Sequence, residues 1–313
     1  MRAVVVDRFG GPEVLRIREV PDPVPGTGQV LVAVEYAGIT FVETQVRAGR
    51  GPGRPPSPPY TPGNGVGGRV VAVGPGVDPA LVGTTVVTTT GGAGGYAELA
   101  LARAEDAIPL PPKVTLRDAV ALLADGRTAV LQHRLAEVQP DEWVLVEAAG
   151  GGVGSLLVQL AAASGAKVVG AARGTGKREL VLSLGAVAYA DYSRPGWERE
   201  ITKITGGVDL VFDGVGGRVG AEGMLAVRPG GRAVVYGMAS GSWTTPPDHV
   251  RVVPSGGTPS PAEIRAAAEE ALALAAAGRL RPVIGQTYPL SEAAQAHRAI
   301  EARTTTGKTL LIP

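Results

Sequence analysis

The chain has 313 residues, which is enough for two domains, with a formal net charge of +1 and no cysteine. The near-zero charge gives no general attraction to nucleic acid or to a membrane surface, so neither is expected as a partner. Without cysteine there are no disulfides, no thiol nucleophiles and no cysteine-ligated zinc. The apolar run Met1 to Asp7 is too short for a signal peptide, and no stretch predicts a membrane span. We therefore expect a cytoplasmic protein.

Residues 1–110 are predicted to be rich in β-structure. Residues 1–7 predict a first strand, and short β-branched runs bounded by Gly and Pro follow at 30–36, 69–73 and 85–89. The segment 50–63 consists mostly of Gly, Pro, Ser and Arg, which excludes a helix or a central strand. We expect it to form a loop near the mouth of the site.

Helices and strands alternate in the middle of the chain. A capping-box-like pattern at Thr115–Asp118 begins a helix, and Gly126 is expected to interrupt it before a second helical stretch at 127–138. The expected strands and helices then follow in the order strand 143–148, helix 153–165, strand 167–172, helix 176–184, strand 187–190, helix 196–204, strand 208–212, helix 218–227, strand 232–236 and strand 249–253. This alternation predicts a parallel, doubly wound sheet.

The last part of the chain returns to other elements. Ser260 and Glu263 form a capping box with Pro261 at the first helical position, and Gly278 ends that helix. A last helix is expected at 291–302 and a last strand at 308–312.

A glycine-rich turn follows the strand expected at 143–148. In the dinucleotide fingerprint G-x-G-x-x-G, Ala149 takes the first position, Gly151 the second and Gly154 the third. Glycines let the backbone approach a pyrophosphate, and the N–H groups at the start of the next helix point at its charge. Because a strand precedes the turn and a helix follows it, the context favours cofactor binding.

The residue after the second strand of this βαβ unit indicates which cofactor is bound. Arg173 stands where an Asp or Glu would bind the ribose 2′-hydroxyl of NAD. Lys177 follows four residues later, so the two cations can face one pocket. An arginine and a lysine suit a 2′-phosphate, which predicts NADPH as the cofactor.

Several segments together resemble the medium-chain dehydrogenase/reductase superfamily, and within it the zinc-free NADPH:quinone oxidoreductase (ζ-crystallin-like) branch. They are, in chain order, Ala37–Glu43, Pro62–Gly68, Gly126–Ala129, the glycine turn, Asp209–Gly217, Arg228–Arg232 and the closing stretch Ala296–Lys308. The resemblance implies an α/β protein with a GroES-like, β-rich catalytic domain at 1–123, completed by 262–313. A Rossmann domain with a doubly wound parallel sheet would occupy 124–261.

The resemblance also argues against a catalytic zinc. Thr40, Asn64 and Ala124 stand where zinc-dependent members carry two cysteine ligands and a histidine, and these three side chains cannot form such a site. The turn 91–95 is too short for the four-cysteine structural lobe. Without a Lewis acid, a quinone or an enone is a better substrate than an alcohol, since its charge delocalises after hydride addition.

Candidate residues follow from these arguments. Thr40 and Tyr60 are expected to donate hydrogen bonds to the substrate oxygen, and Thr128 to hold the nicotinamide or its ribose. Tyr192 matches a tyrosine that the family uses near the 2′-phosphate. The expected cofactor-binding residues are Thr128, Ala149, Gly151, Gly152, Val153, Gly154, Arg173, Lys177, Tyr192, Gly214, Val215, Gly237 and Ser240.

Some features depart from the family pattern or leave a role open. Quinone reductases usually carry Asn at the position of Thr40, and Asp125 stands where an apolar or basic residue is common. Asp125 can be an acid, a ribose contact or a solvated hinge residue. No residue stands out as a proton donor, so solvent is a candidate source.

The sequence therefore predicts an enzyme: a zinc-independent, NADPH-dependent reductase of quinones or α,β-unsaturated carbonyl compounds. One alternative is a biosynthetic enoyl reductase acting on a polyketide-like or acyl-thioester substrate. An alternative of another class is a non-catalytic NADPH-binding sensor or crystallin-like protein. The strand at 249–253 is expected at a sheet edge, which, with the resemblance, predicts a homodimer.

Overall fold

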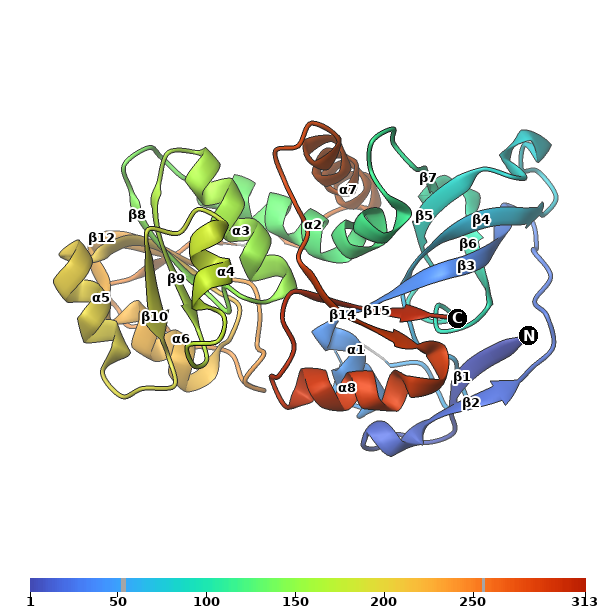
Figure 1. Ribbon diagram of the computed structural model, residues 1–313, viewed down its shortest axis with the longest axis horizontal. Helices are drawn as coiled ribbons and strands as arrows, with labels where there is room; N and C mark the ends of the chain where they lie inside the picture. The colour runs from blue at the N-terminus through green and yellow to red at the C-terminus, as the bar shows by residue number, and fades with distance from the viewer. Residues whose placement is uncertain (52–54, 255–256) are drawn as a thin grey trace. The chain divides into compact units, whose positions relative to one another are not determined.

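The computed structural model describes residues 1–51, 55–254 and 257–313. It divides into two compact units (Figure 1). We call Met1–Ala124 together with Ala271–Pro313 the terminal unit, and Asp125–Glu270 the middle unit. The expected domain limits, 123/124 and 261/262, fall one and nine residues before these divisions. Part of the predicted loop 50–63, namely residues 52–54, lies outside the described residues.

The terminal unit contains a seven-stranded sheet and a separate antiparallel pair of strands (Figure 1). The pair consists of β1 (Arg2–Val6) and β2 (Leu15–Glu19). The large sheet has the order β14-β15-β3-β4-β5-β7, and β6 also pairs with β3. Its strands are β3 (Gln29–Ile39), β4 (Gly65–Val73), β5 (Thr85–Thr89), β6 (Leu99–Arg103), β7 (Ile108–Pro109), β14 (Ile284–Pro289) and β15 (Lys308–Ile312).

Strand β3 is the centre of this unit because it pairs with β4, β6 and β15, all antiparallel. Its run Val30 to Val34 is apolar and mostly buried, as β-branched residues in a central strand should be. Two helices belong wholly to the unit, α1 (Phe41–Arg47) and α8 (Ala293–Glu301). The expected last helix 291–302 is thus α8, with a 3-10 turn at Leu290–Glu292 before it.

Two longer helices contain the divisions between the units, α2 (Leu116–Ala136) and α7 (Pro261–Ala276). The prediction that Gly126 interrupts α2 is wrong, because the helix is continuous through it. Gly126 is buried within the helix, and a glycine costs a helix interior only about 1 kcal/mol. The capping box of Ser260 and Glu263 at the start of α7 is confirmed, with Ser260 Oγ 2.7 Å from Glu263 Oε2.

The middle unit contains a six-stranded parallel sheet in the order β10-β9-β8-β11-β12-β13, with helices on both faces (Figure 1). In sequence terms this order is 3-2-1-4-5-6, the Rossmann arrangement. The strands are β8 (Trp143–Glu147), β9 (Lys167–Ala172), β10 (Ala188–Asp191), β11 (Val208–Asp213), β12 (Val227–Val235) and β13 (Arg251–Val252), and the helices are α3 (Gly152–Ala163), α4 (Arg178–Ser183), α5 (Trp197–Thr205) and α6 (Gly217–Met224).

The predicted doubly wound sheet is confirmed, and its burial explains the sequence. All six residues of β11 are buried, because helices cover both faces of a parallel sheet. Strand order reverses between β8 and β11, so their carboxyl ends form the crevice where such sheets bind ligands. The strand expected at 249–253 is only Arg251–Val252, at the sheet edge.

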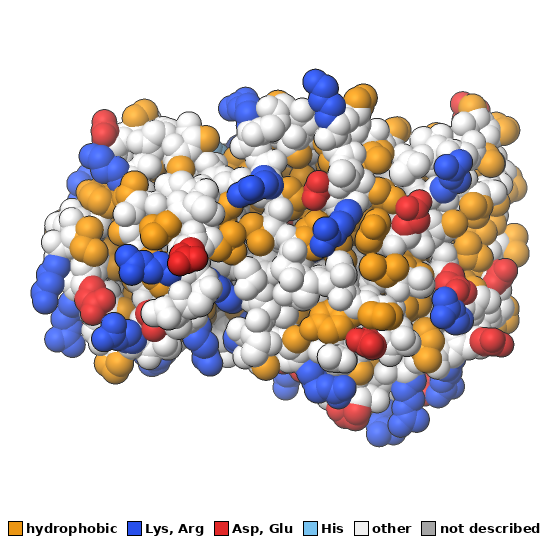
Figure 2. Space-filling view, in the orientation of Figure 1, with side chains coloured by type: hydrophobic (Ala, Val, Ile, Leu, Met, Phe, Trp, Pro, Cys, Tyr) orange, Lys and Arg blue, Asp and Glu red, His pale blue; other side chains and the backbone are white. Residues whose placement is uncertain are grey.

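The surface shows no separation of charge on the face drawn in Figure 2, where cationic and anionic side chains are interspersed. Within residues 1–51, 55–254 and 257–313, none of the helices combines the length and apolarity needed to span a bilayer.

Candidate active site

The glycine turn joins β8 to α3 and has the geometry of a phosphate cradle. Ala148 adopts φ 49°, and the N–H of Gly151 donates to its carbonyl oxygen at 2.8 Å. A Cβ on Gly154 would lie 2.8 Å from the carbonyl carbon of Ala148 and 3.0 Å from Cα of Ala149. Glycine at 154 therefore allows α3 to start directly against the end of β8.

The residues of this turn fit a dinucleotide. Gly151 is the N-cap of α3 and carries no side chain that could cap the first N–H groups of this helix. The N–H groups of the first three helical residues, Gly152, Val153 and Gly154, have no acceptor within the helix. Together with the helix dipole they favour a pyrophosphate. All five predicted residues from Ala149 to Gly154 thus lie in one cradle.

Two predicted cationic residues follow the strand β9 beside this turn. The side chain of Lys177 crosses Gly150, where an added Cβ would lie 2.5 Å from Cδ of the lysine. Arg173 is exposed directly after β9. Ala172, the last residue of β9, accepts the N–H of Tyr192 at its carbonyl oxygen, at 3.2 Å. The three residues therefore gather at the carboxyl ends of β9 and β10. The ring of Tyr192 also makes an edge contact with Trp197, at 6.2 Å between centroids.

A second turn follows β11, and Asp213 organises it. One carboxylate oxygen accepts the N–H groups of Val215 at 2.9 Å and Gly216 at 2.7 Å, and the other accepts the hydroxyl of Thr244. Asp213 thereby holds two loops, and sequence reasoning did not single it out as the organising residue.

The predicted residues after β11 and β12 lie together. The N–H of Ser240 donates to the carbonyl of Val215 at 2.7 Å. A Cβ on Gly237 would lie 2.6 Å from the carbonyl oxygen of Gly214, so the two backbones touch. Since β11 neighbours β8, this group stands next to the glycine turn at the same edge of the sheet.

Two side chains at this edge were not foreseen in their positions. Tyr236 lies across Gly214, where a Cβ would be 2.5 Å from the tyrosine oxygen. Burial, and then the charges of Asp213, Glu147 and Asp125, raise the pKa of Tyr236. Asp125 lies against Gly152, at the start of α3. Thr128 is half-buried one helical turn after Asp125, on the same face of α2.

A buried carboxyl group lies beneath the turn. Glu147, the last residue of β8, is fully buried, and neither side-chain oxygen has a hydrogen-bond partner in the described part of the chain. Burial, followed by the negative charge of Asp213, raises the pKa of Glu147 well above its usual value. Glu147 therefore keeps its proton to a higher pH than an exposed glutamate does.

In the terminal unit, Glu43 organises the surroundings of Thr40. One carboxylate oxygen accepts the N–H of Thr40 at 2.5 Å and its hydroxyl at 3.2 Å, which caps α1. The other accepts the N–H of Asn64 at 2.8 Å. Burial raises the pKa of Glu43. The spacing of Thr40 and Glu43 fits a capping box in the sequence. The bond from Asn64 to Glu43 joins residues from different elements, so local spacing does not predict it.

The buried polar group continues from Glu43 to Tyr96 and His297. The hydroxyl of Tyr96 lies 3.3 Å from Glu43 Oε2 and 3.1 Å from His297 Nε2. Burial, and then the charge of Arg47, lower the pKa of His297 to about 3, so the ring is neutral. The spacing of Glu43, Tyr96 and His297 in the sequence does not predict this group, because the three residues come from α1, the segment before β6, and α8.

Tyr60 is placed beside this group. Its hydroxyl is buried and has no hydrogen-bond partner among residues 1–51, 55–254 and 257–313. Burial raises the pKa of Tyr60, the charge of Arg47 lowers it and that of Glu43 raises it. Tyr60 packs against the apolar cluster that contains Tyr96. A buried donor without a protein partner is consistent with a role in ligand contact. That role of Tyr60 stays a prediction, as does that of Thr40.

Asn64 and Thr40, which the resemblance matched to zinc-ligand positions, make other contacts here. Asn64 Oδ1 accepts the N–H of Gly92 at 2.7 Å, and the hydroxyl of Thr40 faces Glu43. No group of three or more His, Asp or Glu that could hold a metal occurs within the described residues.

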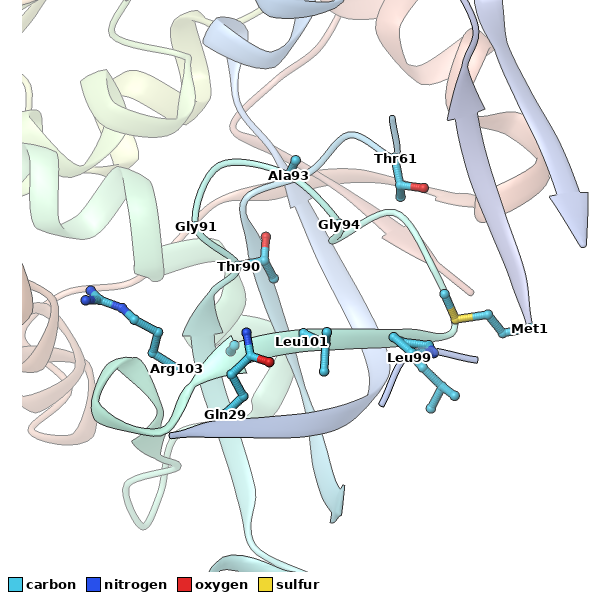
Figure 3. Close-up of a pocket in the computed structure, with 12 residues that line it drawn as sticks. Met1, Gln29, Thr61, Thr90, Gly91, Ala93, Gly94, Leu99, Leu101 and Arg103 are labelled. Atoms are coloured by element: carbon cyan, nitrogen blue, oxygen red, sulfur yellow. The ribbon is translucent and has the colours of Figure 1, made fainter. Parts of the chain in front are cut away.

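A hollow of about 460 Å³ lies in the terminal unit, beside the turn that follows β5 (Figure 3). Thr90, Gly91 and Gly94 form one wall, and Leu99 and Leu101 of β6 form another (Figure 3). None of the predicted catalytic or cofactor residues lines it.

Known proteins match the chain over its whole length. Residues 26–112 match the family model described as "Alcohol dehydrogenase GroES-like domain", and residues 184–311 match "Zinc-binding dehydrogenase". The quinone oxidoreductase of Mus musculus is 35% identical, covering 100% of this chain and 98% of that protein. The chain belongs to the quinone oxidoreductase family of medium-chain dehydrogenases/reductases. The predicted family is thereby confirmed.

One further relative and one solved structure are also similar to the chain. The 2-haloacrylate reductase of a Burkholderia species is 32% identical, covering 99% of this chain and 98% of that protein. The crystal structure of Escherichia coli quinone oxidoreductase complexed with NADPH is 31% identical, with a TM-score of 0.91 and 100% of both chains covered. This likeness confirms the predicted combination of a GroES-like and a Rossmann domain.

Proposed function

We propose that this quinone oxidoreductase family member is an NADPH-dependent reductase of quinones or activated α,β-unsaturated carbonyl compounds. The observation that carries the proposal is the phosphate cradle at the start of α3, with Arg173 rather than an acid after β9. The similar Escherichia coli quinone oxidoreductase, whose structure is a complex with NADPH, supports NADPH as the cofactor. NADPH supplies a hydride to an electron-poor carbon or oxygen of the substrate.

The chain's own residues would bind and orient the reactants. The cradle holds the pyrophosphate, and Arg173 with Lys177 and Tyr192 binds the 2′-phosphate. Thr128, Gly237 and Ser240 hold the nicotinamide half. Thr40 and Tyr60 donate hydrogen bonds to the substrate oxygen, and solvent supplies the proton.

We also propose that the reaction needs no zinc. The support is chemical: threonine, asparagine and alanine at positions 40, 64 and 124 do not provide the N, S or carboxylate ligands of a dehydrogenase zinc. A substrate that delocalises its own negative charge does not require that Lewis acid.

The decisive experiment follows NADPH consumption with a panel of quinones, enones and alcohols. We expect turnover with quinones or enones, none with alcohols, and a preference for NADPH over NADH. Turnover of saturated alcohols alone would contradict the proposal. NADPH binding without turnover of any acceptor would instead favour a non-catalytic sensor or crystallin-like role.

A second candidate function is reduction of an activated alkene in biosynthesis, on a polyketide-like or acyl-thioester substrate. The relative named as a 2-haloacrylate reductase favours it, because that name denotes a substrate with an activated double bond. Adding enoyl thioesters to the same panel separates this function from quinone reduction.

We further propose a cytoplasmic homodimer that binds neither nucleic acid nor membrane. The edge position of β13 supports self-pairing, and the net charge of +1 gives no reason for nucleic-acid or membrane association.

A further inference from the structure

Asp125 places a negative charge at the start of α3. A Cβ built on Gly152 would lie 2.9 Å from Cγ of Asp125 and would overlap its Oδ2. The backbone of Asp125 is fixed in the middle of α2, so the helix directs this side chain at the glycine turn. The carboxylate therefore lies in contact with Gly152, the first residue of α3.

A dinucleotide pyrophosphate would bind the backbone N–H groups at this same helix start. A helix N-terminus stabilises any anion within its first turn, whether a carboxylate or a phosphate. A pyrophosphate adds two negative charges at a place that already holds one. The two anions would therefore repel each other in a partly buried environment and compete for the favourable potential of this helix start.

We propose that Asp125 sets the affinity of the cofactor site by competing with the cofactor's pyrophosphate for the N-terminus of α3. The inference rests on the proposed function, since it concerns the same site. The competition acts on the pyrophosphate, so it weakens NADPH, NADH and the oxidised cofactors alike. Its benefit is in turnover, because a loosely held pyrophosphate speeds the release of the spent cofactor.

Cationic residues near Asp125 also affect the binding of the cofactor. The stem of Lys177 crosses Gly150 on the same turn and brings a cation to it. Arg127 lies two residues away on α2; burial lowers its pKa, and the charge of Asp125 raises it. Lys177 and Arg173 attract the cofactor, whereas Asp125 opposes it, so opposing charges act on one ligand.

The test compares Asp125→Asn, which keeps the shape and removes the charge, with the wild type. NADPH, NADH and ADP-ribose are titrated into the full-length protein by calorimetry at low and high salt. ADP-ribose is the key probe, because it has the pyrophosphate but neither the nicotinamide nor the 2′-phosphate. We expect about tenfold tighter binding of all three ligands, or about 1.4 kcal/mol. The gain should shrink at high salt, because salt screens the repulsion.

A matched control is Glu200→Gln, which removes one exposed acid from α5 of the same unit and should leave all three affinities unchanged. Asp125→Ala is the second variant and gives the same reading if Asp125→Asn folds poorly. Unchanged binding would overturn the inference and assign Asp125 to a hinge. Weaker binding would overturn it in favour of a hydrogen bond from Asp125 to the ribose. If the wild type binds none of the ligands, the proposed function itself fails.

Discussion

Gly154 lies directly against the backbone of Ala148, at 2.8 Å between an added Cβ and the alanine carbonyl carbon. Backbone cannot move aside as a flexible side chain can, so Gly154→Ala must push α3 away from β8. We expect NADPH binding to weaken at least tenfold and the free energy of unfolding to fall by about 1–3 kcal/mol. Fluorescence titration and thermal unfolding measure the two effects.

The control for this variant is Gly176→Ala. No heavy atom lies within 4 Å of a Cβ at Gly176 among the described residues, so that variant should behave as the wild type. Equal NADPH affinities in the wild type and Gly154→Ala would show that the cradle does not hold the cofactor.

The cation after β9 should distinguish NADPH from NADH. Arg173→Ala removes a charge-assisted contact with the 2′-phosphate, so NADPH should bind about ten- to a hundredfold more weakly. NADH lacks that phosphate and should bind as before. Titration of both cofactors measures the effect, with Lys203→Ala as a control that removes an exposed cation from α5. Equal losses for both cofactors would mean that Arg173 does not bind the 2′-phosphate.

Chelation should leave the activity intact. Threonine, asparagine and alanine at positions 40, 64 and 124 are not zinc ligands of a dehydrogenase. After exhaustive dialysis against a strong chelator, the rate of NADPH oxidation should stay within about twofold of its starting value. Elemental analysis of the purified protein provides the second measurement. One tightly bound zinc per chain would contradict the prediction.

Buried Glu147 should make the protein less stable as the pH rises. Burial and then Asp213 raise its pKa above the ordinary 4.5, so the folded state keeps a proton that the unfolded chain has released. Stability therefore falls as the pH rises from about 4.5 towards the raised pKa, by at most about 1.4 kcal/mol per pH unit.

Glu147→Gln has no titrating group at position 147, so its free energy of unfolding should fall less than that of the wild type between pH 5 and pH 8. Urea unfolding at several pH values measures the slope. Glu179→Gln, at an exposed position on α4, should keep the wild-type slope. Parallel curves for Glu147→Gln and the wild type would show that Glu147 is ionised in the folded protein.

The edge strand β13 should mediate a dimer. Light scattering at micromolar concentration should give twice the 31.7 kDa mass of one chain. Val252, partly exposed on this strand, is the place to disrupt pairing, because Val252→Pro removes an N–H from the edge. That variant should be monomeric with unchanged NADPH affinity. A monomer mass for the wild type would rule out the dimer.

The sequence predicts the middle unit well because its signals are local. Apolar strands alternate with helices, and the residues of the glycine turn itself, Ala149, Gly151 and Gly154, determine its shape between β8 and α3. These features depend on a few neighbouring residues. The same locality explains the correct capping box at Ser260.

The errors occur where packing between distant residues decides the outcome. Gly126 favours a break in α2, yet the helix continues because tertiary packing outweighs a small intrinsic cost. The strands β2, β6, β7 and β14 were not predicted. Each is defined by its pairing with another strand, as β14 pairs with β15 and β6 with β3. The positions of Tyr236 over Gly214 and of Asp125 against Gly152 also follow from the assembled sheet and helices.

The place of β15 in its sheet determines the order in which the chain can fold during synthesis. β15 lies between β14 and β3, and pairs Thr309 with Ile39. All six strands of the middle unit lie within residues 143–252, so a ribosome releases that whole sheet first. Until residues 309–311 have emerged, the end of β3 from Ala37 to Ile39 lacks its β15 partner, although β4 and β6 already pair with the rest of the strand. The pairing that completes the terminal sheet therefore forms only after the whole middle unit has been translated.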